Sequence, residues 1–371
     1  MITFSKDLLT LNPAYNDSII QFESTTITGA TRAMITIEGM SFVSVPNNEK
    51  FTFNFKEIIK SIINTNRLED TIIPDLSDEF LYPDGNIVKT FQVDITVFNL
   101  TSNESITKNY KFSRSVEQLM NYKRLININA PIKILLPTQN FIDYTVRVFE
   151  GYPFDFGIYG IGAWQTYYFK NLTTNQRTGD LVNNHNHVTR VFLSDGANST
   201  TELDVLVQSS TLNKLELWVD DNFTANINIL KMESDCGIYL KWLNSRGSYS
   251  YWKFNSVYKS TITPKTIDDF EGRYDNLQNL TATSYLIGKT ATQTIAVESN
   301  YTDDDANYLA DLVTSPHVQM YSHTTPFNQQ QEFDFIGVKV SDTAFIPLDT
   351  KRNKNKMKLT ITLPALNTIT N

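Results

Sequence analysis

The segment Cys236–Phe254 holds the densest group of side chains that could bind a ligand. Tyr249 and Tyr251 fall on one face of a predicted strand, and Trp252 and Phe254 fall on the other. Aromatic rings on an exposed strand could stack on a sugar, a base or a protein partner. The alternative is cross-strand packing inside a β-sandwich. Because one face must be core, we expect the other to be exposed, and Tyr249, Tyr251 and Trp252 are candidate interface residues.

His185 and His187 are the one pair of histidines spaced to share a strand face, as two metal ligands would. No carboxylate follows them before Asp195, so an exposed polar loop is the expected structure. His317 and His323 each stand alone in a turn-rich stretch, and we expect no metal there either.

Two acidic clusters, Asp303–Asp305 and Asp220–Asp221, lack the Gly and Glu that a calcium loop places at set distances. The first cluster is better explained as the start of a helix and the second as a turn. The sequence therefore predicts neither a metal nor a cofactor.

The only basic run lies near the end of the chain. It could contact an acidic neighbour or nucleic acid, although a solvated loop leading into the last strand is the commoner meaning. We include its cations among the candidate interface residues, namely Lys351, Arg352, Lys354 and Lys356.

The sequence shows no enzyme signature. It has no phosphate-binding Gly-rich loop and no nucleophile elbow. Cys236 lies beside Gly237 on a predicted strand, where a small core residue is commoner than a nucleophile. Carboxylate pairs of the glycosidase kind assemble in space and stay open as an alternative. The expectation is a protein that is not an enzyme and has no catalytic residue.

The elements that must position these residues are mainly strands. Phe91, Val93, Ile95 and Val97 alternate with polar residues, and the same period of two recurs in the segments 144–148, 227–229 and 357–363. Many outward positions are Thr, which is β-branched and still wettable. This pattern is typical of half-exposed antiparallel sheets.

Few helices are predicted. Residues 55–63 carry one apolar stripe, with Asn54 or Thr52 as the cap. A second helix starts at Thr302 and ends before Pro316. A third, weaker pattern covers residues 116–122.

Composition excludes several classes. Among the 371 residues, 12% are aromatic, which excludes a disordered chain, and only 14 are Gly and 12 are Pro, which excludes a collagen-like one. The net charge of −8 argues against nucleic-acid binding. A single cysteine cannot form an internal disulfide. The N-terminus lacks the pattern of a secretion signal, and no apolar run approaches the length that spans a bilayer, so no membrane insertion is expected.

The fold class that follows is mainly β, with two or three antiparallel β-sandwich-like domains and a few short helices. Turn-rich stretches divide the chain into an N-terminal arm (1–25), a β domain with one amphipathic helix (26–126), a central β domain (127–254) and a C-terminal β domain with one helix (255–371).

Three stretches in the last 220 or so residues have a familiar order. They are Gly151–Phe156, the hairpin from Tyr239–Asn244 to Trp252–Phe254, and a closing group of Leu312–Val318, Phe335–Val340 and Lys358–Leu363. This order resembles virion structural proteins of tailed phages that infect Bacteroidota, most of all the distal-tail or baseplate proteins of the tail tip. The resemblance implies a homo-oligomeric ring in the virion tail, made in the host cytoplasm, which contacts the tail tube, the hub and receptor-binding proteins.

Two other functions stay open at this stage. A carbohydrate-binding adhesin module would use Tyr249, Tyr251 or Trp252 to stack on host glycans. A polysaccharide hydrolase would need a carboxylate pair. A head or neck protein of the virion is a close variant of the leading hypothesis.

Overall fold

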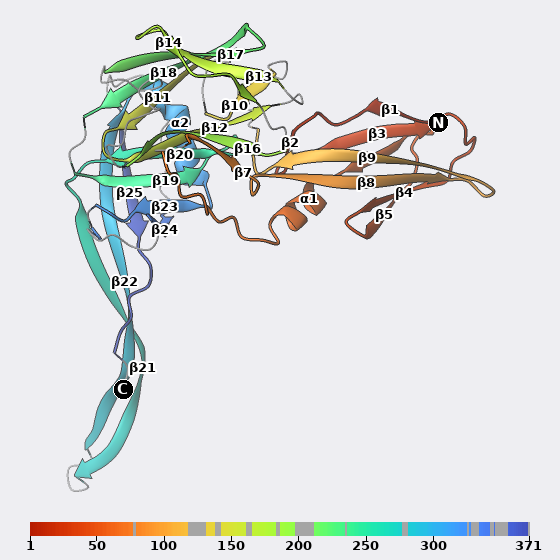
Figure 1. Ribbon diagram of the computed structural model, residues 1–371. Coiled ribbons are helices and arrows are strands. Elements are labelled where there is room, and N and C mark those ends of the chain that lie inside the picture. The colour runs from red at the N-terminus through yellow and green to blue at the C-terminus, as the bar shows by residue number, and fades with distance from the viewer. Residues whose placement is uncertain are drawn as a thin grey trace. The chain divides into compact units, whose positions relative to one another are not determined.

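The computed structural model describes residues 1–76, 79–117, 131–137, 142–160, 165–182, 186–196, 211–233, 236–276, 281–324, 326–327, 334–341, 345 and 355–369. The chain divides into two compact units. The first unit comprises Met1–Glu233 with Asn244–Ser250, and the second comprises Ser234–Leu243 with Tyr251–Asn371. The described residues are mainly β-strand with a few short helical segments, which confirms the predicted fold class (Figure 1).

The first unit begins with a β-sandwich. One of its sheets has the order β1–β3–β6, and the other has the order β2–β9–β8–β4–β5. The strands are β1 (Ile2–Lys6), β2 (Asn12–Pro13), β3 (Ile19–Ser24), β4 (Arg32–Ile37), β5 (Met40–Ser44), β6 (Phe51–Asn54), β8 (Val88–Phe98) and β9 (Asn103–Ser113). All pairs are antiparallel except β2–β9, which is parallel.

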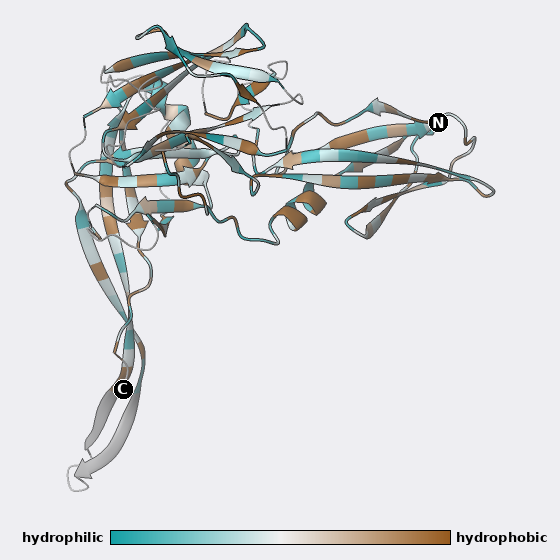
Figure 2. Cartoon of the chain, viewed as in Figure 1, coloured by the Kyte–Doolittle hydropathy of each residue, from teal (hydrophilic) through white to brown (hydrophobic). Residues whose placement is uncertain are grey.

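Alternation along β8 produces the core of this sandwich, as predicted. Phe91, Val93, Ile95 and Val97 are fully buried, and the residues between them face outward (Figure 2). Burying one such side chain contributes about 1.5–3 kcal/mol.

The prediction of an N-terminal arm over residues 1–25 is wrong. Ile2, Ile20 and Phe22 lie in the same buried cluster as the β8 residues, and β1 pairs with β3. Short polar stretches separate β1, β2 and β3, and these stretches led to the prediction of an extended arm. The apolar residues between them instead complete the core of the sandwich.

Helix α1 (Lys56–Ile63) confirms the first predicted helix. Its stripe buries Ile59 and Ile63, and Asn54 accepts a hydrogen bond from the Lys56 amide at 3.1 Å. The N-cap residue is Phe55, not the predicted Asn54 or Thr52, and it makes no side-chain cap bond; the Asn54 side chain, one residue earlier, satisfies one of the free N–H groups of the first turn.

The first unit contains two further sheets. One has the order β10–β12–β16–β7, and the other has the order β11–β18–β17–β13–β14, with β15 also paired to β13. The strands are β7 (Leu81–Asp84), β10 (Ile132–Ile134), β11 (Asp143–Phe149), β12 (Pro153–Gly160), β13 (Thr166–Asn171), β14 (Gln176–Arg177), β15 (Leu181–Val182), β16 (Val188–Asp195), β17 (Leu212–Val219) and β18 (Asn222–Met232). Phe156 and Phe169 meet edge to face at 6.2 Å, so the two sheets pack together.

The second unit is built on one sheet with the order β20–β19–β23–β24–β25–β22–β21. Its strands are β19 (Ile238–Leu243), β20 (Tyr249–Phe254), β21 (Lys259–Asn276), β22 (Thr281–Tyr301), β23 (Val318–Tyr321), β24 (Phe335–Val340) and β25 (Asn355–Thr362). Alternation in β25 buries Met357, Leu359 and Ile361, as predicted.

Helix α2 (Asp303–Thr314) packs against β19 of this sheet. Asp305 accepts hydrogen bonds from the backbone N–H and the hydroxyl of Thr302, at 2.9 and 2.7 Å, so the helix starts where the sequence predicted. Its buried face holds Tyr308 and Leu312 in addition to Ala306 and Leu309.

The predicted domain boundaries differ from this division. The expected cut at 126/127 lies outside the described residues, and so does most of the weak helix predicted over 116–122. The second cut was expected after Phe254, whereas the unit boundary falls after Glu233 and the turn Asn244–Ser250 returns to the first unit. In the part of the chain that the structure describes, no helix has the length and apolar character to cross a membrane.

Candidate functional site

The β19–β20 hairpin, which carries the predicted aromatic platform, is buried on both faces. Gly247 adopts a positive φ of 80° in the turn, and its N–H donates to the Asn244 carbonyl at 3.2 Å, as the predicted turn requires. Every residue of β20 except Lys253 is buried.

The candidate residues of β20 are therefore core residues. Tyr251 packs on Tyr239, and its backbone N–H donates to the Tyr308 hydroxyl at 2.8 Å. Trp252 donates through Nε1 to the Ser299 hydroxyl at 3.0 Å. With Tyr249, Tyr251 and Trp252 exposed by 0, 2 and 4%, the prediction that one aromatic face is open to a partner is wrong. The sequence could not reveal this burial, because β20 would show the same order of residue types whether one face or both faces were covered.

Tyr249 stacks on a buried charge cluster of the first unit. The guanidinium carbon of Arg190 lies 4.6 Å from the centre of the Tyr249 ring. Arg190 donates two hydrogen bonds to Asp155, each 2.7 Å, and a third to Asp70 at 2.6 Å. Burial, together with the nearby carboxylates, raises the pKa of Tyr249 well above 10. Asp84 lies in the same electrostatic neighbourhood, where burial raises its pKa.

Acidic side chains converge at this cluster of the first unit. Asp155 and Asp70 accept hydrogen bonds from one arginine, and all three side chains are at most 4% exposed. Carboxylates held in this way act as a structural ion-pair network. No sequence pattern marks this cluster, because Asp70, Asp155 and Arg190 are far apart in the chain.

The basic run is described only in part. Lys351, Arg352 and Lys354 lie outside the described residues. Lys356 is exposed on β25, where its Nζ lies 2.5 Å from a Glu298 carboxylate oxygen on β22. The hydrogen bond from Lys356 lowers the pKa of Glu298. Lys356 thus forms a cross-strand pair on the sheet surface.

The histidines form no metal centre in the described part of the chain, where no group of three or more His, Cys, Asp or Glu residues could hold an ion. His185 lies outside the described residues. His323 pairs with Asp334 at 2.8 Å and stacks on Tyr321. Cys236 is exposed, so its prediction as a core residue is wrong.

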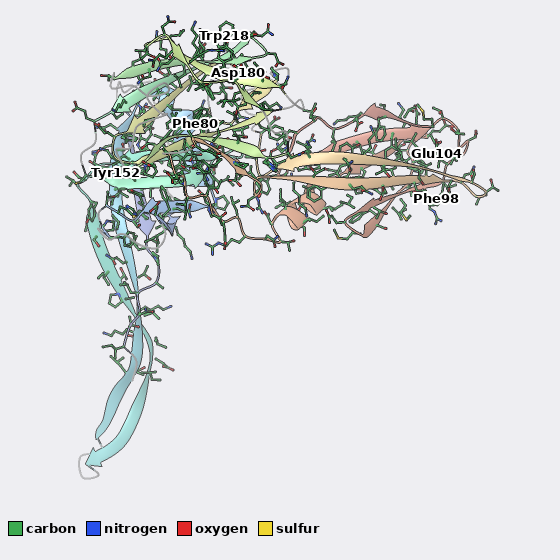
Figure 3. The ribbon with its side chains drawn as sticks, in the orientation of Figure 1. Phe80, Phe98, Glu104, Tyr152, Asp180 and Trp218 are labelled. Carbon is green, nitrogen blue, oxygen red and sulfur yellow. The ribbon has the colours of Figure 1, made fainter. Side chains whose placement is uncertain are left out.

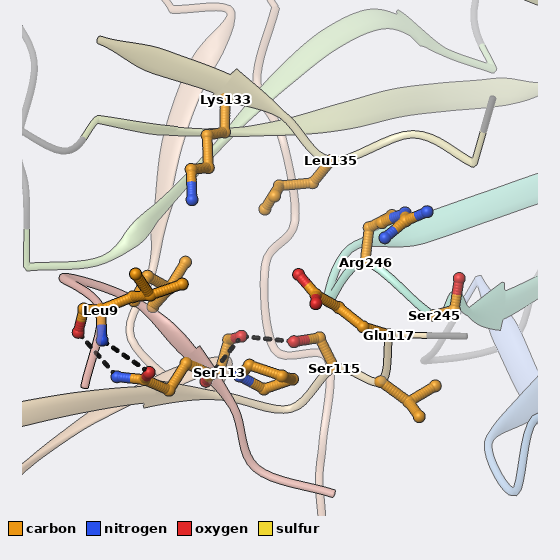
Figure 4. Close-up of a pocket in the computed structure, with 12 residues that line it drawn as sticks. Leu9, Ser113, Ser115, Glu117, Lys133, Leu135, Ser245 and Arg246 are labelled. Atoms are coloured by element: carbon orange, nitrogen blue, oxygen red, sulfur yellow. Dashed lines mark hydrogen bonds between the residues drawn. The ribbon is translucent and has the colours of Figure 1, made fainter. Parts of the chain in front are cut away.

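A narrow pocket of the first unit lies beside the end of β9. Its lining includes Ser113, Ser115, Glu117, Lys133 and Arg246 (Figure 4). The hydroxyls of Ser113 and Ser115 hydrogen-bond with each other at 2.5 Å. Nearby, the Asn12 amide donates to the Leu9 carbonyl at 2.8 Å. The same Asn12 amide also donates to the Lys111 carbonyl of β9 at 3.2 Å, so polar groups here hold the lining segments in place, which is a structural use.

The most unusual surface feature is a β-arm, defined here as β21 and β22. The two strands are 18 and 21 residues long, and they run past the rest of the sheet of the second unit (Figure 1). β25 pairs with β22 only from Thr294 to Tyr301. Among the described residues, Ala291 bridges to Leu366, and further out the strand pairing of the arm is between β21 and β22 alone.

The β-arm is exposed over much of its described length and carries apolar side chains. Every residue from 261 to 269 is exposed. Ile262, Ile267 and Leu286 are exposed by 59, 50 and 44%. β21 is also an edge strand, but Pro264 and several register shifts interrupt it. Such interruptions discourage indiscriminate strand addition. A partner would therefore contact the β-arm through its side chains more readily than by adding a strand to its backbone edge.

Comparisons with known proteins give no family. No family model and no curated protein matches the sequence. Among solved structures, the fibronectin(III)-like modules of Clostridium thermocellum CbhA match with 7% identity and a TM-score of 0.22, over 63% of this chain and 95% of theirs. Domains 4–9 of the surface layer protein SbsC match with 9% identity and a TM-score of 0.21, over 86% and 53%. Both TM-scores are below 0.5, so these likenesses assign the chain to no known fold family.

Proposed function

We propose that this protein is a non-enzymatic structural component of a phage tail tip. Copies of it form a ring in which each copy contacts its neighbour through the β-arm. The ring links the tail tube to the hub or to receptor-binding proteins, and the protein belongs to the virion after its synthesis in the host cytoplasm.

The β-arm is the observation that carries this proposal. An isolated two-stranded hairpin is at best marginally stable in water, and stability usually needs a third strand or a packed face. Beyond the Ala291–Leu366 bridge the described pairing is between β21 and β22 only, and Ile267 and Leu286 are exposed by 50 and 44%. Ordering this much chain costs about 1–2 kcal/mol per residue in backbone entropy. Contact with a second copy would bury the exposed side chains and offset that cost.

The sequence resemblance supports the same role. Its stretches coincide with strands of the sheets: Gly151–Phe156 enters β12, Phe335–Val340 is β24, and Lys358–Leu363 covers most of β25. β12 and β25 supply buried residues of the fold, and β24 is partly buried. A likeness carried by the strands of the fold fits a protein whose function depends on shape and on repeated contacts between copies.

The low charge content is compatible with close assembly. Only 19% of residues are charged, and the net charge is −8 over 371 residues. Repulsion between neighbouring copies is weak at this charge density, particularly at physiological salt, where the screening length is about 8 Å.

Mass photometry and negative-stain microscopy of the pure protein, alone and with the tube and hub proteins of its tail, test the proposal. We expect a closed oligomer that joins the tube or hub. A persistent monomer that enters no tail complex contradicts the proposal. Binding to head or neck proteins instead of the tube would also overturn the assignment to the tail tip.

A further inference from the structure

The sheet β11–β18–β17–β13–β14 of the first unit carries an ordered row of aromatic side chains on the face away from its core. Tyr167, Phe169, Leu215 and Leu217 are buried on the inner face. Tyr168 and Trp218 alternate with them and are only partly buried, and Phe223 is 43% exposed. We call Tyr168, Trp218 and Phe223 the aromatic row. Figure 3 labels Trp218 on this sheet.

The rings of the aromatic row touch in sequence across three strands. Tyr168 and Trp218 are cross-strand partners whose ring planes are parallel within 4°, with centres 6.2 Å apart. Trp218 meets Phe223 edge to face at 6.1 Å. The row extends to Arg177 on β14, whose guanidinium carbon lies 4.6 Å from the centre of the Tyr168 ring. These contacts fix the orientation of the rings before any ligand binds.

A row of polar side chains runs beside the aromatic row. The pairing register aligns Asp143, Asn226, Glu216 and Lys170 on four adjacent strands, with Arg177 next to Lys170 on β14. Lys170 follows Tyr168 by two residues, and Glu216 precedes Trp218 by two, so both rows occupy one face. Glu216 accepts a hydrogen bond from the Trp218 indole at 2.9 Å, and Asn226 donates to Asp143 at 2.6 Å.

We propose that this face binds a neutral glycan chain that lies across the strands. Aromatic faces take the C–H face of a pyranose ring, and carboxylate, amide and guanidinium groups exchange hydrogen bonds with hydroxyls. The polar row carries charges of both signs, with Asp143 and Glu216 beside Lys170 and Arg177, and Arg177 also pairs with Asp180 at 3.3 Å. A face without an excess of one sign along this row favours a ligand without net charge. A protein partner would instead need a broader apolar centre at the core of its interface. The inference does not depend on the tail-tip proposal.

Titration calorimetry of the full chain with five neutral hexasaccharides tests this site. The panel comprises cellohexaose, mannohexaose, xylohexaose, laminarihexaose and maltohexaose, with a chondroitin sulfate hexasaccharide as the acidic comparison. We expect at least one neutral hexasaccharide to bind, and Trp218→Ala to weaken that binding tenfold or more. Phe98→Ala, which removes a partly buried ring stacked beneath Arg32 elsewhere in the unit, is the matched control and should bind as the wild type does.

A second variant covers the case in which Trp218→Ala fails to fold. Trp218→Phe keeps a ring in place, and it should retain binding but lose the ligand-induced change in tryptophan fluorescence. Failure of every neutral hexasaccharide to bind overturns the proposal, as does binding of the acidic one alone. Undiminished binding by a folded Trp218→Ala variant, or loss of the oligomer caused by that substitution, also contradicts it.

Discussion

Arg190 holds the carboxylate of Asp155 through two parallel hydrogen bonds of 2.7 Å, from Nε to Oδ2 and from Nη2 to Oδ1. Both side chains are almost completely buried, at 2 and 0% exposed. They stand on the neighbouring strands β16 and β12, which pair antiparallel in the first unit. A bidentate pair in this environment fixes the position of one strand against the next.

Removing one partner of this pair should be costly. Asp155→Asn leaves Arg190 buried with less compensation, and we expect the free energy of unfolding to fall by about 3–5 kcal/mol. Urea titration followed by circular dichroism measures the loss. The matched control is Asp180→Asn, which breaks the exposed 3.3 Å pair with Arg177 and should change stability by less than about 0.5 kcal/mol. Equal effects of the two substitutions would contradict this account of the cluster.

Asp84 gives a pH-dependent prediction with a defined sign. Burial raises its pKa in the folded state, although the Asn86 amide and Arg190 act in the opposite direction. Between the unfolded and the folded pKa of Asp84, the folded state therefore holds a proton that the unfolded state releases. Proton binding by Asp84 thus favours the folded state at low pH, and this stabilisation is lost as the pH rises through the folded pKa. Asp84→Asn should stabilise the protein at pH 7 relative to wild type, and the gain should shrink toward pH 4. A gain that stays constant with pH would refute the assignment.

Gly157 on β12 is predicted to tolerate no side chain. A Cβ at this position would lie 2.4 Å from the Ser248 hydroxyl oxygen and 2.8 Å from its Cβ. Gly157→Ala should lower stability by about 1–3 kcal/mol, as overpacking of a core does. Adding Ser248→Gly should restore part of the loss in thermal unfolding. Gly179→Ala, where nothing lies within 4 Å of the new Cβ, should be close to neutral.

Charges on the β-arm should weaken assembly without unfolding the chain. Ile262→Lys and Ile267→Lys place cations where the proposal buries apolar side chains between copies. We expect at least a tenfold weaker self-association in sedimentation velocity, with an unchanged melting temperature. Leu100→Lys, at a site 95% exposed outside the arm, should assemble as the wild type does. The idea fails if all three variants associate equally well.

Much of the fold could be predicted because its strands are half buried. The period of two along β8 and β25 reports directly which residues face the core. The starts of the two helices could be predicted from Asn54 and Thr302, whose side chains form hydrogen bonds in the first turns of α1 and α2. Local signals of this kind require no knowledge of the tertiary structure.

The aromatic surface could not be located from the sequence, because its position depends on which faces the tertiary structure covers. β20 reads as a half-exposed strand but is covered on both faces, so Tyr251 and Trp252 are buried. Trp218 and Tyr168 lie about fifty residues apart in the chain and form a row only through the pairing of β13 with β17. In the sequence, the alternation of Leu217 with Trp218 could indicate that the two side chains lie on opposite faces of a strand. It could not indicate that β13 is the strand paired with it.

The most direct test of the central claim removes the outer β-arm. Lys265 and Thr290 are cross-strand partners, so an Asn-Gly turn can join them in place of residues 266–289. In sedimentation velocity at matched concentration, we predict that the wild-type chain is an oligomer and that the shortened chain, which keeps a β-type circular dichroism spectrum and an unchanged melting temperature, is a monomer. A shortened chain that forms the same oligomer as the wild type, or a wild type that remains monomeric, would contradict the account.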